Sequence, residues 1–130
     1  MTKKPKLHLL FNHTLTQEQS SDAKTSLLCD VIVSLPQELQ GLWSSVPPDL
    51  KSLKKYLKPI KEYMDANVKK DDFVLVQGDF GATYMMVDFV KSLGAKPIYA
   101  TTSRDVVEVE EGDKIIKKSI FRHKQFREYE

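Results

Sequence analysis

The chain has 130 residues, of which 41% are hydrophobic and 29% are charged, and its formal net charge is +2. This size and composition predict one globular domain, and the small net charge argues against a duplex nucleic acid as partner. The single cysteine, Cys29, excludes a disulfide framework and a thiol-rich metal site. No apolar run approaches the ~20 residues of a membrane span, and the N-terminus lacks an apolar signal region. We therefore expect a cytoplasmic protein with no membrane partner.

The first half of the chain predicts two strands and three helical segments. Residues 7–11 are an apolar run typical of a strand. Thr16 and Gln19 have capping-box spacing, which predicts a helix from near Gln17 to about Leu28. Residues 30–35 predict a second strand, ended by Pro36, and residues 37–43 a short helix or turn. Residues 44–48 form a proline-marked loop.

The longest helix is expected to open at Asp49, to carry an apolar stripe and to kink near Lys55, because Pro59 removes a backbone donor. The stripe consists of Leu50, Leu53, Leu57, Ile60 and Met64.

The second half predicts a βαβ unit followed by a hairpin. Residues 73–76 are short and continuously apolar, as in a strand buried on both faces. A loop with Gly78 and Gly81 follows, and glycines allow a sharp turn or close approach to a ligand. A helix then buries one apolar face and ends at Gly94, a typical C-cap residue. Residues 96–100 predict the next strand, and residues 106–110 pair with residues 114–121 around a turn at Gly112.

The resulting order is βαβαβαβ and then a hairpin. Alternating strands and helices imply a mainly parallel sheet with helices on both faces. The right-handed crossover rule then makes the domain an α/β, three-layer, Rossmann-like fold with a C-terminal β-hairpin.

Polar residues follow the predicted strands, and the carboxyl ends of parallel strands share one edge of a sheet, where ligands bind. Hydroxyl, amide and guanidinium groups bind phosphate oxygens, and the next helix points its N-terminal N–H groups at the same place. Phosphate or nucleotide binding is therefore the natural use of this edge. Its residues are Asn12, His13, Thr14, Ser34, Gln77, Gly78, Asp79, Phe80, Thr101, Thr102, Ser103 and Arg104.

The glycine-containing loop matches no standard nucleotide motif. It lacks both the GK[ST] of a P-loop and the GxGxxG of a dinucleotide-binding turn. His13, Asp79 and His123 have no spacing that supports a metal site, and we expect neither a metal nor a cofactor.

Each candidate also has a purely structural interpretation. His13 can satisfy backbone carbonyls, and Asp79 can cap the helix that follows it. Arg104 can pair with Asp105 or Glu108 on the surface, His123 can be solvated within a run of bases, and Phe80 can pack in the core. Met85 and Met86 are predicted to be core residues.

Four blocks together resemble one family. They are LLFNHTLT at residues 9–16, LVQGDFGATY at 75–84, PIYATTSR at 97–104 and SIFRHKQFREY at 119–129. In this combination the chain resembles the small CRISPR-associated Csx proteins of the type III ring nuclease group, and the resemblance covers nearly its whole length.

The resemblance implies a fold akin to CARF sensor domains and a homodimer that binds cyclic oligoadenylate, usually the tetra-adenylate, across its two-fold axis. It also implies metal-independent cleavage by the ribose 2′-OH, giving 2′,3′-cyclic phosphate ends and switching off the antiviral signal. Positioning and charge stabilisation can supply most of the acceleration. The expected catalytic residues are His13, Asp79 and Arg104, with His13 as acid or base. The expected substrate-binding residues are Asn12, Thr14, Gln77, Gly78, Phe80, Gly81, Thr83, Thr101, Thr102 and His123.

Three other interpretations stay open. The same residues would serve a sensor or sponge that binds a cyclic nucleotide without cutting it. A flavodoxin-like, mononucleotide-dependent enzyme would share the topology, although no phosphate loop is recognisable. Finally, the polar loop ends could be helix caps with no ligand. The basic residues between Lys114 and Arg127 could line a ligand groove or contact a second subunit.

Overall fold

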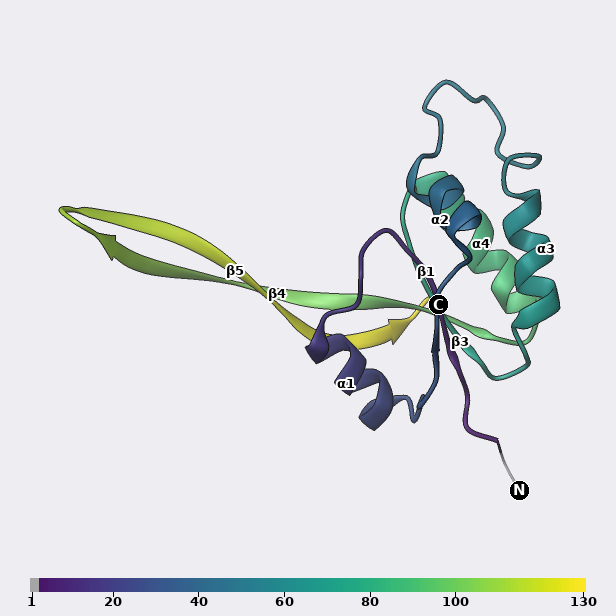
Figure 1. Ribbon diagram of the computed structural model, residues 1–130, viewed down its shortest axis with the longest axis horizontal. Helices are drawn as coiled ribbons and strands as arrows, with labels where there is room; N and C mark the ends of the chain where they lie inside the picture. The colour runs from purple at the N-terminus through teal and green to yellow at the C-terminus, as the bar shows by residue number, and fades with distance from the viewer. Residues whose placement is uncertain (1–2) are drawn as a thin grey trace.

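The computed structural model describes residues 3–130 as a three-layer α/β domain with one five-stranded sheet (Figure 1). The strand order is β2-β1-β3-β4-β5; the first four strands are parallel and β5 is antiparallel to β4. This arrangement is compatible with the expected Rossmann-like fold and confirms the C-terminal hairpin. The elements are β1 (Leu7–Phe11), α1 (Gln17–Ser26), β2 (Ile32–Val33), α2 (Gln37–Ser44), α3 (Lys58–Asn67), β3 (Phe73–Gln77), α4 (Phe80–Ser92), β4 (Lys96–Glu111) and β5 (Lys114–Glu128).

Helix α1 covers one face of the sheet. It begins with the predicted capping box, in which Gln19 N–H donates to Thr16 Oγ1 and Thr16 N–H donates to Gln19 Oε1. Ala23 of this helix is fully buried, together with Leu7, Phe11, Leu75, Ile98 and Cys29. Alternate residues of β1 thus supply this smaller core, as the two-residue period of a strand requires.

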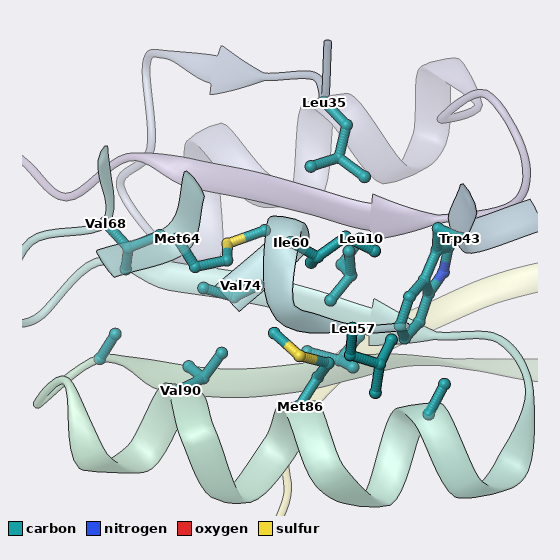
Figure 2. Close-up of a cluster of buried hydrophobic side chains, with 13 residues drawn as sticks. Leu10, Leu35, Trp43, Leu57, Ile60, Met64, Val68, Val74, Met86 and Val90 are labelled. Carbon is teal, nitrogen blue, oxygen red and sulfur yellow. The ribbon is translucent and has the colours of Figure 1, made fainter. Parts of the chain in front are cut away.

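Helices α2, α3 and α4 cover the other face and enclose the larger core (Figure 2). Leu10 and Val74 point into this layer from the sheet, where Met86 and Val90 of α4 meet them, and Val76 belongs to the same cluster. All five side chains are fully buried. The prediction of a strand buried on both faces is confirmed, because Leu75 lies in the smaller core between Val74 and Val76 in the larger one.

The prediction of a long helix from Asp49 is wrong. Helix α3 begins only at Lys58, with Pro59 in its first turn, and residues 49–57 form turns and bends. Pro59 could not sit inside a helix without losing a bond to the carbonyl of Lys55 and clashing with it, whereas a first turn tolerates proline. The apolar stripe is buried only at its C-terminal half, and Leu50 is exposed.

The second strand is also shorter than predicted, with two residues, and β4 is much longer. Residues 101–104, expected as a loop at the strand end, continue β4 without a break into the hairpin. A turn with Gly112 at φ +60° joins β4 to β5, as predicted. The far part of this hairpin, residues 103–122, projects beyond the helices, and we call it the arm (Figure 1).

A buried carboxylate closes the amino edge of the sheet. Asp72 accepts hydrogen bonds from Lys6 N–H, Lys69 N–H and His8 Nε2, each at 3.0 Å. Burial acts to raise the pKa of Asp72, but these three donors and the charge of His8 outweigh it and lower the pKa. This network lies at the opposite edge from the candidate site.

No helix in residues 3–130 is both long enough and apolar enough to cross a membrane.

Candidate functional site at the carboxyl edge of the sheet

The carboxyl ends of β1 and β3 form the topological switch point of the sheet. β1 lies between β2 and β3 and is parallel to both, while the connection after β1 runs over one face and the connection after β2 over the other. The order β2-β1-β3-β4 is also that of flavodoxin-like folds, whose ligand sits at this point. The antiparallel β5 departs from that pattern. The loops after β1 and β3 are therefore where a ligand is expected.

The loop after β1 brings three predicted residues into one hollow. Asn12, His13 and Thr14 are exposed and line a cavity of about 390 Å³ that Ser34 and Gln40 also border. Gln40 of α2 fixes the end of the strand, because its Nε2 donates to Phe11 O at 2.8 Å. The imidazole of His13 rests edge-on against the Phe11 ring, with 5.4 Å between centroids. This hollow offers amide, imidazole and hydroxyl groups to a polar ligand.

The turn after β3 starts α4. Asp79 is the N-cap, and its carboxylate accepts a hydrogen bond from Ala82 N–H at 3.0 Å. The capping interpretation of Asp79 is thus confirmed, and its negative charge occupies part of the anion-favouring helix end. Phe80 and Gly81 follow in the exposed first turn.

Gly78 is required by packing in this fold. A Cβ at this position would lie 2.8 Å from Cε2 and Nε1 of Trp43. The buried indole itself donates to Gln77 O at 3.1 Å, so it cannot easily move away. Gly81 is different, because a Cβ there would meet only Asp79 and Leu53 at 3.6 Å, an ordinary contact distance. The first glycine therefore serves close helix–strand packing, and neither has a positive φ.

The structural interpretation of Phe80, that its ring packs in the core, is wrong. Its side chain is 95% exposed, and Tyr84, one turn later on α4, is 79% exposed. The two rings border a cavity of about 360 Å³ that Thr83, Lys91 and Tyr129 also line. Two exposed aromatic rings one helical turn apart form a surface on which flat rings can stack.

The remaining predicted residues are engaged in the hairpin. Gln77 Oε1 accepts from Ala100 N–H at 2.7 Å, beyond the last paired residues of β3 and β4. Thr101 Oγ1 donates to Gln125 O at 3.1 Å, where a bulge interrupts the β4–β5 ladder. Arg104 lies on the arm, and its Nε donates to Ser119 Oγ across the ribbon at 3.0 Å. The alternative interpretation, a surface pairing of Arg104 with Asp105 or Glu108, is replaced by this contact.

The structural interpretation of His123, that its side chain is solvated, is wrong. Its Nε2 donates to Asp22 Oδ2 at 2.7 Å, and only 6% of its side chain is exposed. Nδ1 is buried and has no hydrogen-bond partner among residues 3–130. With Thr102, Phe121 and the first turn of α1, His123 borders a third hollow of about 460 Å³. The imidazole is thus oriented by a carboxylate, and its buried Nδ1 is shielded from a ligand in this hollow.

The predicted site therefore divides into three neighbouring groups: the β1 loop, the start of α4 and the base of the arm. Two relevant residues were missed. The i, i+4 spacing of Phe80 and Tyr84, away from the Met86 and Val90 face, could have indicated Tyr84. No sequence signal indicated Asp22, whose partner lies 101 residues away. Within the described part of the chain, no cluster of three or more His, Cys, Asp or Glu side chains is placed to hold a metal ion.

Comparison with known proteins places this chain in a family. A family model described as "Uncharacterized protein MJ1673 family" matches residues 5–127. The chain belongs to the MJ1673 family. A relative described as "Uncharacterized protein MJ1673", from Methanocaldococcus jannaschii, is 48% identical over 125 residues, which cover 96% of this chain and 97% of the relative. No solved structure matches the chain significantly. The MJ1673 match includes all three groups of the candidate site and the arm.

Proposed function

We propose that this protein binds a cyclic oligoadenylate, with cyclic tetra-adenylate as the first candidate, and opens the ring without a metal. The observation that carries this proposal is the 95% exposed Phe80 at the carboxyl edge, paired with Tyr84. Adenine bases stack on exposed aromatic rings, and each stacked base contributes about 1–3 kcal/mol. The N–H groups of Phe80 and Gly81 in the first turn of α4 lie beside these rings and suit a phosphate oxygen, whereas Asp79 already accepts from Ala82 N–H.

The β1 loop would then supply the chemistry. The ribose 2′-OH attacks the adjacent phosphorus, the bond from phosphorus to the 5′-oxygen breaks, and a 2′,3′-cyclic phosphate forms. The 2′-OH loses a proton and the 5′-oxygen gains one, so the reaction needs no other reactant. His13 is exposed beside Asn12 and Thr14, and an imidazole can take or give this proton near neutral pH. Arg104 belongs to the arm and would contact a phosphate only where the ligand or another subunit brings them together.

In this proposal the fold is CARF-like and the protein acts in the cytoplasm as a homodimer. A ring with two-fold symmetry would meet the same patch on both subunits. The product would no longer activate type III CRISPR effectors, which is the role that the resemblance in the sequence implies.

Binding without cleavage is the second candidate, and one feature of His13 favours it. Among residues 3–130, no carboxylate hydrogen-bonds to His13, whereas Asp22 orients His123. An imidazole without an orienting partner is a weaker acid–base catalyst. A sensor or sponge would need only the stacking surface and the phosphate contacts.

The deciding experiment mixes protein in excess with cyclic tetra-adenylate in EDTA and separates the nucleotides over time. We expect linear products with cyclic-phosphate ends, a slower single-turnover rate for His13→Ala, and weaker binding for Phe80→Ala. Leu50→Ala, which removes an exposed apolar side chain elsewhere, is the matched control. An intact ring that co-elutes with the protein would support the sensor, and an intact ring that does not bind would refute both candidates.

A further inference from the structure

The arm is a two-stranded ribbon that has no helix against it beyond its base (Figure 1). Its strands are on the order of 30 Å long, at about 3.3 Å per residue. An isolated two-stranded ribbon is only marginally stable in water, and both of its edges present unpaired backbone groups. The pairing of β4 with β5 is nonetheless continuous from Thr102 to Glu111. An arm of this kind calls for a partner surface.

One face of the arm sorts its charges by strand. Residues that pair across the ribbon share a face, and Val109 pairs with Ile116. Val107 and Ile120 lie on the same face, which we call the valine–isoleucine face. Its charged residues on β4 are all acidic, and those on β5 are all basic: Asp105 and Glu111 on β4, and Lys114, Lys118 and Arg122 on β5.

The opposite face lacks this order. On β4 it carries both signs of charge, Arg104 with Glu108 and Glu110, and Lys117 lies on β5. It also exposes Val106, Ile115 and Phe121, so the two faces differ in the order of their charges and not in the presence of apolar residues. At its base this face turns toward α1, where His123 contacts Asp22. Only the valine–isoleucine face therefore carries charge of a single sign on each strand, acidic on β4 and basic on β5.

We propose that the valine–isoleucine face docks on the same face of a second copy of this chain, with the two arms side by side and pointing the same way. A two-fold axis along the arm sets β4 of one copy opposite β5 of the other. The acidic strand of each copy then faces the basic strand of the other, Glu111 lies at the level of the other copy's Lys114, and Val109 meets Ile116. A two-fold axis across the arm would instead set β4 opposite β4, with like charges together. Charge therefore selects the parallel arrangement.

This arrangement deepens the proposed function without depending on it. The arms leave the sheet from its carboxyl edge, so parallel arms bring the two candidate sites toward each other. The arm alone is too small for a standard interface of about 800 Å² per subunit, so the bodies must also touch.

Charge reversal tests the proposal. One variant carries Asp105→Lys and Glu111→Lys, the other Lys114→Glu and Lys118→Glu. Molar mass is measured by analytical ultracentrifugation over a concentration series, without nucleotide. We expect a wild-type dimer, an at least tenfold weaker dimer for each variant alone, and a restored dimer in their equimolar mixture. The matched control, Glu108→Lys with Glu110→Lys, changes the charge equally on the opposite face and should stay dimeric.

The mixture also guards against misfolding, because an unfolded variant would not be rescued by its complement. A monomeric wild-type protein, variants that dimerise as well as wild type, or a mixture that stays monomeric would each overturn the proposal. These results are independent of the nucleotide assay: a monomer that still cleaves the ring refutes the arm interface alone, and a dimer that binds no nucleotide refutes only the proposed function.

Discussion

His123 of the last strand donates a 2.7 Å hydrogen bond to Asp22 of the first helix. Both side chains are largely buried, with 6% and 20% exposed. Burial acts to raise the pKa of Asp22, but hydrogen bonds from Ser26 and His123 and the charge of His123 outweigh it, so the pKa is lowered. This contact joins the base of the arm to α1.

Removing the carboxylate should loosen the base of the arm. Asp22→Ala leaves the buried His123 without an acceptor, which should cost about 1–3 kcal/mol of unfolding free energy. Amide hydrogen exchange should become faster at residues 119–126 and in α1, while β1 and β3 keep their protection. In a His123→Phe background the same substitution should cost little, because the pair no longer exists. An equal loss in both backgrounds would show that the contact contributes nothing.

Most of the fold could be predicted from the sequence because the signals that specify its elements are local. The capping box at Thr16, the Gly94 C-cap and the apolar run of β3 each specify a structure from neighbouring residues alone, and all three are confirmed. The helix predicted from Asp49 failed where two local signals conflicted. An apolar stripe favoured a helix, and the steric effect of Pro59 set its start instead.

The site was harder to predict because its arrangement depends on distant contacts. The hydroxyls at Thr101 and Thr102 were assigned to a loop, since nothing nearby reveals that β5 pairs with them and extends β4. Gly78 had the sequence appearance of a ligand-binding glycine, although Trp43, 35 positions earlier, is what requires it. Similarly, exposure of Phe80 depends on how α4 is placed on the sheet.

The two glycines of the β3–α4 turn should respond differently to alanine. Gly78→Ala forces a methyl group to 2.8 Å from the Trp43 indole, and such overpacking costs about 1–3 kcal/mol. Gly81→Ala should be neutral or stabilising by up to about 1 kcal/mol, since it lies in a helix and its Cβ has ordinary contacts. Urea unfolding measures both. Equal effects of the two substitutions would contradict the packing role of Gly78.

The buried Asp72 should make stability fall in acid. Because its pKa is lowered in the folded state, it stabilises the fold at pH values above the unfolded pKa of about 3.9. That stability is lost as the pH falls through the lower folded pKa. Asp72→Asn should unfold more easily at neutral pH, by about 1–3 kcal/mol, and differ less from wild type in acid. Thermal unfolding of both proteins over a pH series checks this. A difference that stays constant down to the acid limit would exclude Asp72 as the source.

Truncating Phe80 should separate binding from stability. Because the ring is 95% exposed, Phe80→Ala should change the unfolding free energy by less than about 0.5 kcal/mol. If adenine stacks on it, affinity for cyclic tetra-adenylate should fall about 5- to 150-fold, which corresponds to about 1–3 kcal/mol. Phe80→Trp should keep the affinity, since it preserves an aromatic face, and Tyr84→Ala should reproduce part of the loss. Titration calorimetry with protein of verified folding measures each value. Unchanged affinity in Phe80→Ala would remove the stacking surface from the ligand site and leave the β1 loop as the place to search next.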